Sequence, residues 1–150
     1  MARRGDAQQL RSAVATKAGC RVSVAGAEGG PSILELVGEF DLDAVPEIDR
    51  FLRRNLGPLY HQEHLVIDLA RTTFVDSSFI AFVMRLSTAQ RVTRRELLLV
   101  RPVGQVRRLL ALVGLPNVVP VFETVEAAVD SLLSGRLPVI PPAFRATGAA

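Results

Sequence analysis

Residues 64–85, HLVIDLARTTFVDSSFIAFVMR, decide how the rest of the chain is organised. They open with the apolar run 65–67, which is typical of a buried strand. They close with apolar residues at helical spacing over residues 80–84. Between the two lies Asp76-Ser77-Ser78, and such small polar side chains favour a helix N-cap because their oxygens accept hydrogen bonds from unpaired backbone N–H groups. We therefore predict a strand, a short loop and a helix that begins at Ser77.

Ser77 has two interpretations at this position. It can be part of a plain helix cap, a common role for serine. It can also be a phosphorylation site, because a phosphate at the positive end of a helix finds free backbone donors. The residue types alone leave both interpretations open.

The segment IDLARTTFVDSSFIAF, residues 67–82, resembles the signature of the STAS domain found in bacterial anti-sigma factor antagonists. In that signature an apolar strand ends in Asp-Leu, and Asp-Ser-Ser/Thr-Gly opens a helix after a short loop. The resemblance implies that the partner anti-sigma kinase phosphorylates Ser77, which directly follows Asp76, with Ser78 as the second candidate. The chain departs from the signature at Phe79, where the family usually has Gly.

Two further segments resemble the same family. Gly38-Glu39-Phe40-Asp41 is similar to the family's Gly-Glu-Leu-Asp, which ends a strand and lies beside the phosphorylated loop. The resemblance implies that Asp41 helps to orient the site, while its residue type equally favours an N-cap. Residues 101–115, with a Pro after a strand and a helix that ends in Gly-Leu, resemble the later half of the family. The resemblance covers about residues 21–133.

Hydrophobic periodicity predicts one α/β domain with the order β-β-α-β-α-β-α-β-α. Alternating strands and helices after a first hairpin favour a mixed, mostly parallel sheet with helices packed against it, which the resemblance also implies. The domain is predicted to span residues 20–134, between a flexible arm (1–19) and a Pro-rich tail (135–150). The predicted strands are 21–25, 32–37, 65–69, 96–100 and 118–122, and the predicted helices are 45–56, 77–91, 103–113 and 124–133. The predicted core includes Val66, Ile67, Leu69, Ile80, Val83, Leu98 and Val100.

Composition indicates a globular protein of one domain. A chain of 150 residues, 49% apolar and 22% charged, can bury a core without disulfides or metal. Cys20 is the only cysteine, so no internal disulfide is possible and a cytoplasmic setting fits. No apolar run approaches the roughly 18–20 residues of a membrane span, and no signal-peptide pattern follows Arg3 and Arg4. We expect no membrane partner.

Charge does not indicate nucleic-acid binding. The net charge is +3 and the pI about 10, but the arginines are scattered in pairs at 53–54, 94–95 and 107–108. Aromatic residues that would stack on bases do not alternate with them. We interpret these pairs as solvated surface and expect no direct contact with nucleic acid, although arginine pairs suit an acidic protein partner.

No pattern in the sequence indicates an active site. His61 and His64 precede a strand, and neither cysteines nor an acidic cluster complete a metal site around them. The sequence around Ser77 is not a Gly-x-Ser-x-Gly nucleophile elbow. We predict that the protein is not an enzyme and that it uses no metal or cofactor.

The resemblance implies an anti-sigma factor antagonist. Such a protein would bind an anti-sigma factor, itself a serine kinase, and release a sigma factor until phosphorylation of Ser77 ended the binding. We predict a partner-binding face of Asp41, Asp76, Ser77, Ser78 and an exposed Phe79, on a monomer or weak homodimer. The alternative is a STAS-like ligand-sensing or scaffold module that is not phosphorylated, which a bulky Phe79 beside the serine favours.

Overall fold

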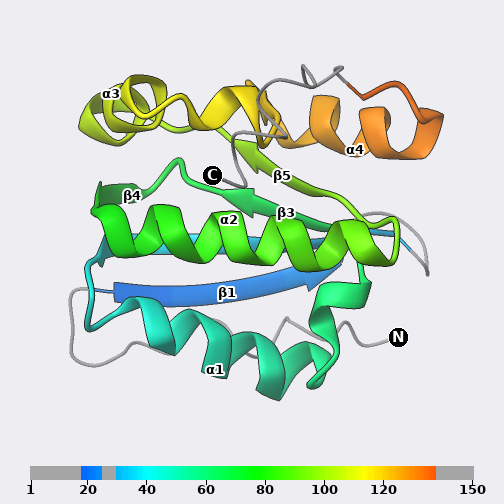
Figure 1. Ribbon diagram of the computed structural model, residues 1–150, viewed down its shortest axis with the longest axis horizontal. Helices are drawn as coiled ribbons and strands as arrows, with labels where there is room; N and C mark the ends of the chain where they lie inside the picture. Colours follow the sequence, from blue (N-terminus) through cyan, green and yellow to red (C-terminus); the bar gives the residue numbers. More distant parts are fainter. Residues whose placement is uncertain (1–17, 25–29, 138–150) are drawn as a thin grey trace.

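The computed structural model describes residues 18–24 and 30–137, which form a six-stranded sheet with helices on both faces (Figure 1). The strand order is β1-β2-β3-β5-β6, and β4 pairs separately with β2. Only β1 and β2 run antiparallel, and the other pairs are parallel. The strands are β1 (Ala18–Val24), β2 (Ser32–Phe40), β3 (Leu65–Asp68), β4 (Thr72–Val75), β5 (Leu97–Val100) and β6 (Val121–Phe122).

Side chains of successive strand residues point to opposite faces of the sheet, and each face has its own apolar cluster. In β3, Leu65 and Ile67 belong to the larger cluster, which α1, α2 and α3 cover, whereas Val66 belongs to the smaller cluster under α4. Coverage on both faces explains the continuous apolar runs 65–67 in β3 and 97–100 in β5. The helices are α1 (Val45–Leu56), α2 (Ser77–Val92), α3 (Gly104–Leu112) and α4 (Val125–Ser134), with short 3-10 helices η3 (Tyr60–Gln62) and η4 (Leu115–Asn117).

The predicted fold class and the mostly parallel sheet are confirmed, and the predicted order of elements is confirmed except for one additional strand. The sequence interpretation missed β4, which it treated as loop. β2 continues three residues beyond its predicted end, and this extension gives β4 a partner. The predicted strand 118–122 is shorter than expected, because the backbone N–H groups of Val118 and Val119 bond to Leu115 in the turn after η4.

The predicted core residues are buried with one exception, Ile80, which is half-buried against the edge of the larger cluster. The first strand begins at Ala18, inside the predicted arm. The rest of that arm, the tail after residue 137 and the turn around residues 25–29 lie outside the described residues.

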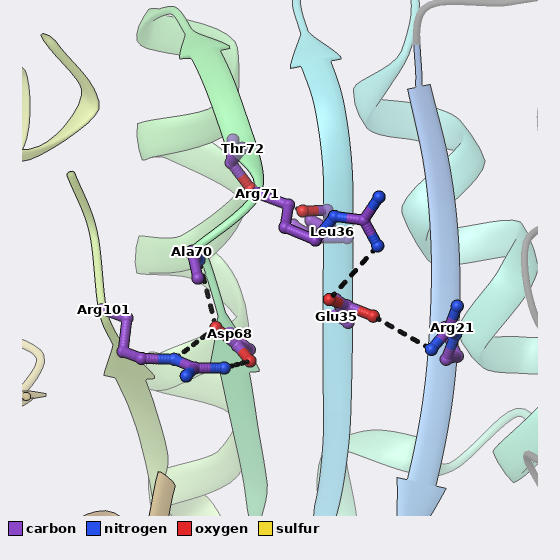
Figure 2. Close-up of polar contacts among 8 residues, drawn as sticks. All are labelled: Arg21, Glu35, Leu36, Asp68, Ala70, Arg71, Thr72 and Arg101. Atoms are coloured by element: carbon purple, nitrogen blue, oxygen red, sulfur yellow. Dashed lines mark hydrogen bonds and ion pairs between the residues drawn. The ribbon is translucent and has the colours of Figure 1, made fainter. Parts of the chain in front are cut away.

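A row of charged side chains crosses the sheet on the face opposite α1 and α2. Arg21, Glu35 and Asp68 are neighbours in register across β1, β2 and β3. Figure 2 shows the side chains of Arg21 and Arg71 both reaching Glu35, and Arg101 beside Asp68. Arg101 Nη2 lies 2.6 Å from the buried Asp68 Oδ2. Each carboxylate therefore has an arginine partner, which offsets the repulsion between like charges on adjacent strands.

The same region holds the turn that leads from β3 into β4. Asp68 Oδ1 accepts a hydrogen bond from the backbone N–H of Ala70 (3.0 Å), and the buried hydroxyl of Thr72 donates to the carbonyl of Leu36 (2.8 Å). Figure 2 places these residues at the junction of the two strands. The turn sets the direction of β4 and thereby the position of the segment that follows it.

Candidate functional site

Asp41 and Asp76 lie side by side because of strand register. Phe40 and Val75 are partners at the ends of the parallel strands β2 and β4. The next residue of each strand is therefore an aspartate, at the carboxyl edge of the sheet. Asp41 Oδ1 accepts hydrogen bonds from the backbone N–H groups of Asp43 (3.1 Å) and Ala44 (3.0 Å). Asp41 thus caps the turn before α1 and neighbours the Asp76 loop, whereas the N-cap of α1 itself is Ala44, without a side-chain hydrogen bond, so Asp41 is not the helix N-cap that its residue type favoured.

Asp76 is the N-cap of α2. Its carboxylate accepts hydrogen bonds from the backbone N–H of Ser78 (2.9 Å) and from the Ser78 hydroxyl. Burial raises the pKa of Asp76, but hydrogen bonds from Ser78 and from the backbone of Phe79 and Leu42 outweigh it, so this pKa lies below its usual value. The contribution of Leu42 shows that the loop after β2 reaches the Asp76 carboxylate.

The two serines at this helix start differ in what their hydroxyls do. Ser77 is the first residue of α2 and is exposed, as predicted. Its hydroxyl makes no hydrogen bond with any residue in the described part of the chain. Ser78 is half-buried and its hydroxyl donates to Asp76. Of the two serines, Ser77 is therefore the one that is exposed and whose hydroxyl is not engaged by the described residues.

Phe79 is buried, and the prediction that it is exposed is wrong. Its side chain has 0% exposure and belongs to the larger apolar cluster. It shares one face of α2 with Phe82, Val83 and Leu86, at the spacing i, i+3, i+4, i+7 of a core-facing stripe. That spacing was readable in the sequence, and it would have assigned Phe79 to the core.

Three other apolar side chains are exposed at the carboxyl edge of the strands, and the sequence interpretation missed them. Leu42 follows β2 and is 70% exposed, Phe74 in β4 is 37% exposed, and Val103 before α3 is 50% exposed. The start of α3 is joined to β4 by the Gln105 side-chain amide, which donates to the carbonyl of Thr73 (3.1 Å). Exposed apolar groups beside polar ones are typical of protein-binding surfaces.

The described residues contain no group of three or more His, Cys, Asp or Glu that could hold a metal ion. His64 has a structural role, since its Nδ1 accepts a hydrogen bond from the backbone N–H of Glu96 (3.0 Å). Burial and the nearby Arg95 lower the pKa of His64. Burial raises the pKa of the Cys20 thiol to about 12, so this cysteine is a protonated core residue.

None of the helices among the described residues is long and apolar enough to cross a membrane. The polar side chains of the site lie at the end of β2 and at the start of α2, on a surface where Ser77 is exposed. Such a surface suits recognition by another protein.

The sequence profile described as "Mlab, STAS domain" matches residues 23–120, which is more than half of the chain. No curated protein sequence matches the chain.

Solved structures of the same fold include anti-sigma factor antagonists. A proposed antagonist from Thermotoga maritima superposes with a TM-score of 0.61 at 16% identity, over 75% of this chain and 92% of that one. The antagonist SpoIIAA, unphosphorylated, gives 0.58 at 20% identity, over 78% and 99% of the two chains. Phosphorylated SpoIIAA from Bacillus gives 0.54 at 19% identity, over 74% and 98%. At these identities the similarity establishes the fold.

Proposed function

The chain belongs to the STAS domain family, and on that premise we propose that it is an anti-sigma factor antagonist. In its unphosphorylated form it binds an anti-sigma factor, a serine kinase, and so releases a sigma factor. Phosphorylation of Ser77 ends this binding. The protein acts in the cytoplasm and catalyses no reaction itself.

The free hydroxyl of Ser77 is the observation that carries this proposal. A kinase needs an exposed hydroxyl that is not already engaged, and Ser77 meets that requirement whereas Ser78 does not. The Asp76 carboxylate accepts a hydrogen bond from the backbone N–H of Ser78 and so holds the first turn of α2 in place. Ser77 is therefore presented at a defined position on a rigid element.

The replacement of the family's Gly by Phe79 does not oppose the proposal. A phenylalanine ring beside the acceptor would hinder a kinase, but this ring points into the core with 0% exposure. The surface beside Ser77 is formed by other residues. In the sequence, a bulky Phe79 beside the serine favoured a module that is not phosphorylated. Because the ring is buried, it no longer favours that alternative.

The proposed binding face consists of Asp41, Asp76, Ser77 and Ser78, with Leu42 in place of Phe79 as its apolar anchor. Leu42 is 70% exposed, and its backbone N–H contributes to the lowered pKa of Asp76. Phosphorylation adds about 1.5 to 2 negative charges beside two carboxylates. Such charge is costly to bury in an interface and repels its neighbours, so binding weakens.

The test uses a candidate anti-sigma kinase from the same host. Intact-mass measurement after incubation with ATP should show a single phosphate on the wild type and on Ser78→Ala, and none on Ser77→Ala. Calorimetry should show that Ser77→Ala binds the partner with or without ATP. Ser77→Asp should bind more weakly than wild type, but only in part, because one charge imitates phosphate poorly.

Two results together would contradict the proposal: no mass shift in the wild type, and equal affinity of wild type and Ser77→Asp for the partner. Leu42→Ala tests the anchor separately, since it should weaken binding without preventing phosphorylation. A matched control is Leu112→Ala, which removes an apolar side chain that is 83% exposed at the end of α3. This control should bind normally.

A further inference from the structure

Helices α1 and α2 lie beside each other on one face of the sheet (Figure 1). Residues of both helices line a groove. The groove has a volume of about 440 Å³. Its floor is apolar, formed by Val45 of α1 and by Phe82 and Leu86 of α2. These three side chains belong to the larger core cluster, so the floor is rigid.

The polar groups on the α1 side of the groove already satisfy one another. Asp49 Oδ2 accepts a hydrogen bond from Arg53 Nε (2.9 Å), and Asp49 Oδ1 accepts one from the Tyr60 hydroxyl (2.7 Å). Asp49 and Arg53 therefore cancel in charge. Tyr60 also lines the groove, and its hydroxyl is held by the same carboxylate.

Arg85 on the α2 side is a cation without a counter-charge among the described residues. It makes no hydrogen bond or ion pair with any residue that the structure describes. No acidic residue occurs in α2, so its own helix cannot neutralise it. With Asp49 and Arg53 paired, the groove carries one net positive charge beside an apolar floor.

We propose that this groove binds a small organic anion with an apolar body and one carboxylate, which pairs with Arg85. The volume lies in the range of small-molecule sites, about 300–1,000 Å³. The apolar floor suits the apolar body of such a ligand. The charge of Arg85 pairs with the carboxylate and so orients the ligand. The groove is a second site, formed by other residues than Asp76 and Ser77, and it does not depend on the proposed function.

The probe is 4-phenylbutanoate, and its neutral counterpart of nearly the same shape is 4-phenylbutanamide. Each is titrated into the full-length ¹⁵N-labelled protein, and amide chemical shifts are followed by NMR. The carboxylate should shift amides of α1 and α2 around the groove in a saturable way. The amide should bind about tenfold more weakly, as expected from the loss of one charge-assisted hydrogen bond.

Two variants locate the site. Arg85→Gln should weaken binding of the carboxylate about tenfold and leave binding of the amide unchanged. Ala89→Phe places a ring in the groove, which Ala89 lines, and should abolish binding of both probes. The matched control is Arg108→Gln, which removes an exposed arginine of α3 and should change neither affinity.

The proposal is wrong if millimolar 4-phenylbutanoate shifts no amide around the groove, or if the shifts lie elsewhere. It is also wrong if Arg85→Gln and Arg108→Gln bind the carboxylate equally well. Spectra of each variant without probe show whether it is folded. These results do not depend on whether Ser77 is phosphorylated.

Discussion

The two ends of α2 are held in place by different means. At its beginning, Asp76 caps the helix through bonds to Ser78, two residues away. At its end, the fully buried Gln90 donates from Nε2 to the carbonyls of Glu63 (2.8 Å) and Glu96 (3.1 Å). Arg91 donates from Nη2 to the carbonyl of Val118 (2.7 Å). The first end is held mainly by bonds within its own turn, with the backbone of Leu42 as a further donor, whereas side-chain bonds to other segments hold the second.

The difference shows how one helix can combine a fixed position with an accessible surface. Side-chain bonds to three separate loops anchor its last turn to the amino edge of the parallel strands. Its first turn needs only a cap and an inward-facing Phe79, which leaves Ser77 exposed. A modification at Ser77 therefore changes the surface without breaking the contacts that position the helix.

Phe79→Ala should have the largest effect and shows whether the first turn is anchored from below. Deleting a fully buried phenylalanine side chain removes apolar contacts and leaves a cavity, so we expect a loss of about 3–5 kcal/mol. Urea unfolding measures it, and an unchanged m-value shows that only stability changed. The control Phe74→Ala should cost clearly less, because this ring is 37% exposed. If Phe79→Ala and Phe74→Ala lost the same free energy of unfolding, the Phe79 side chain would not be a core residue.

Gln90→Leu tests the anchoring of the last turn. The variant removes the Nε2 donor from the carbonyls of Glu63 and Glu96, although the Glu96 carbonyl still accepts from the backbone N–H of Leu65 (3.0 Å), and we expect a loss of about 1–3 kcal/mol. The lower part of that range is expected, since the buried Gln90 Oε1 has no partner among the described residues and its removal offsets part of the loss. Hydrogen exchange should quicken at residues 93–96 while the first turn of α2 is unchanged. Faster exchange at both ends would mean that the two ends are not independent.

Asp76→Ala tests the cap of the first turn and should cost about 0.5–2 kcal/mol. The pKa of Asp76 lies below its usual value, so the carboxylate stabilises the folded state above the unfolded pKa of about 3.9 and loses this effect as pH falls through the folded pKa. Asp76→Asn should keep most of the cap at neutral pH. The stability difference between wild type and Asp76→Asn, followed by urea unfolding, should shrink only below about pH 4. If the stability difference instead changed between about pH 5 and 7, its pH dependence would arise from a group other than Asp76.

His64→Gln should have the smallest effect and concerns the network near the last turn. The pKa of His64 is lowered by burial, so the unfolded chain takes up the proton first and stability falls as pH drops below about 6.5. Thermal unfolding of the wild type should show this decline between about pH 7 and 5, and His64→Gln should reduce it. His61→Gln is the control and should keep the decline. The same decline in all three proteins would rule out His64 as its source.

Local chemistry made part of this site predictable. The start of α2 follows from Asp76-Ser77-Ser78, because a cap bonds to N–H groups only two or three residues away. The core positions of β3 and β5 follow from their continuous apolar runs. Phe79 was wrongly predicted to be exposed because it was assigned to the loop or first helical turn. Its helical spacing with Phe82 and Val83, which indicates the core, was not used.

The sequence by itself determined the cap at Asp76, the exposed Ser77 and the order of elements except β4, since each of these depends on neighbours within one or two helical turns. Only the tertiary structure decided that Asp41 lies beside Asp76, because this requires the register of β2 against β4. The groove at Arg85 likewise exists only where two helices distant in sequence pack together. Periodicity and capping are short-range, whereas register and helix packing are set by contacts between segments that the chain brings together only on folding.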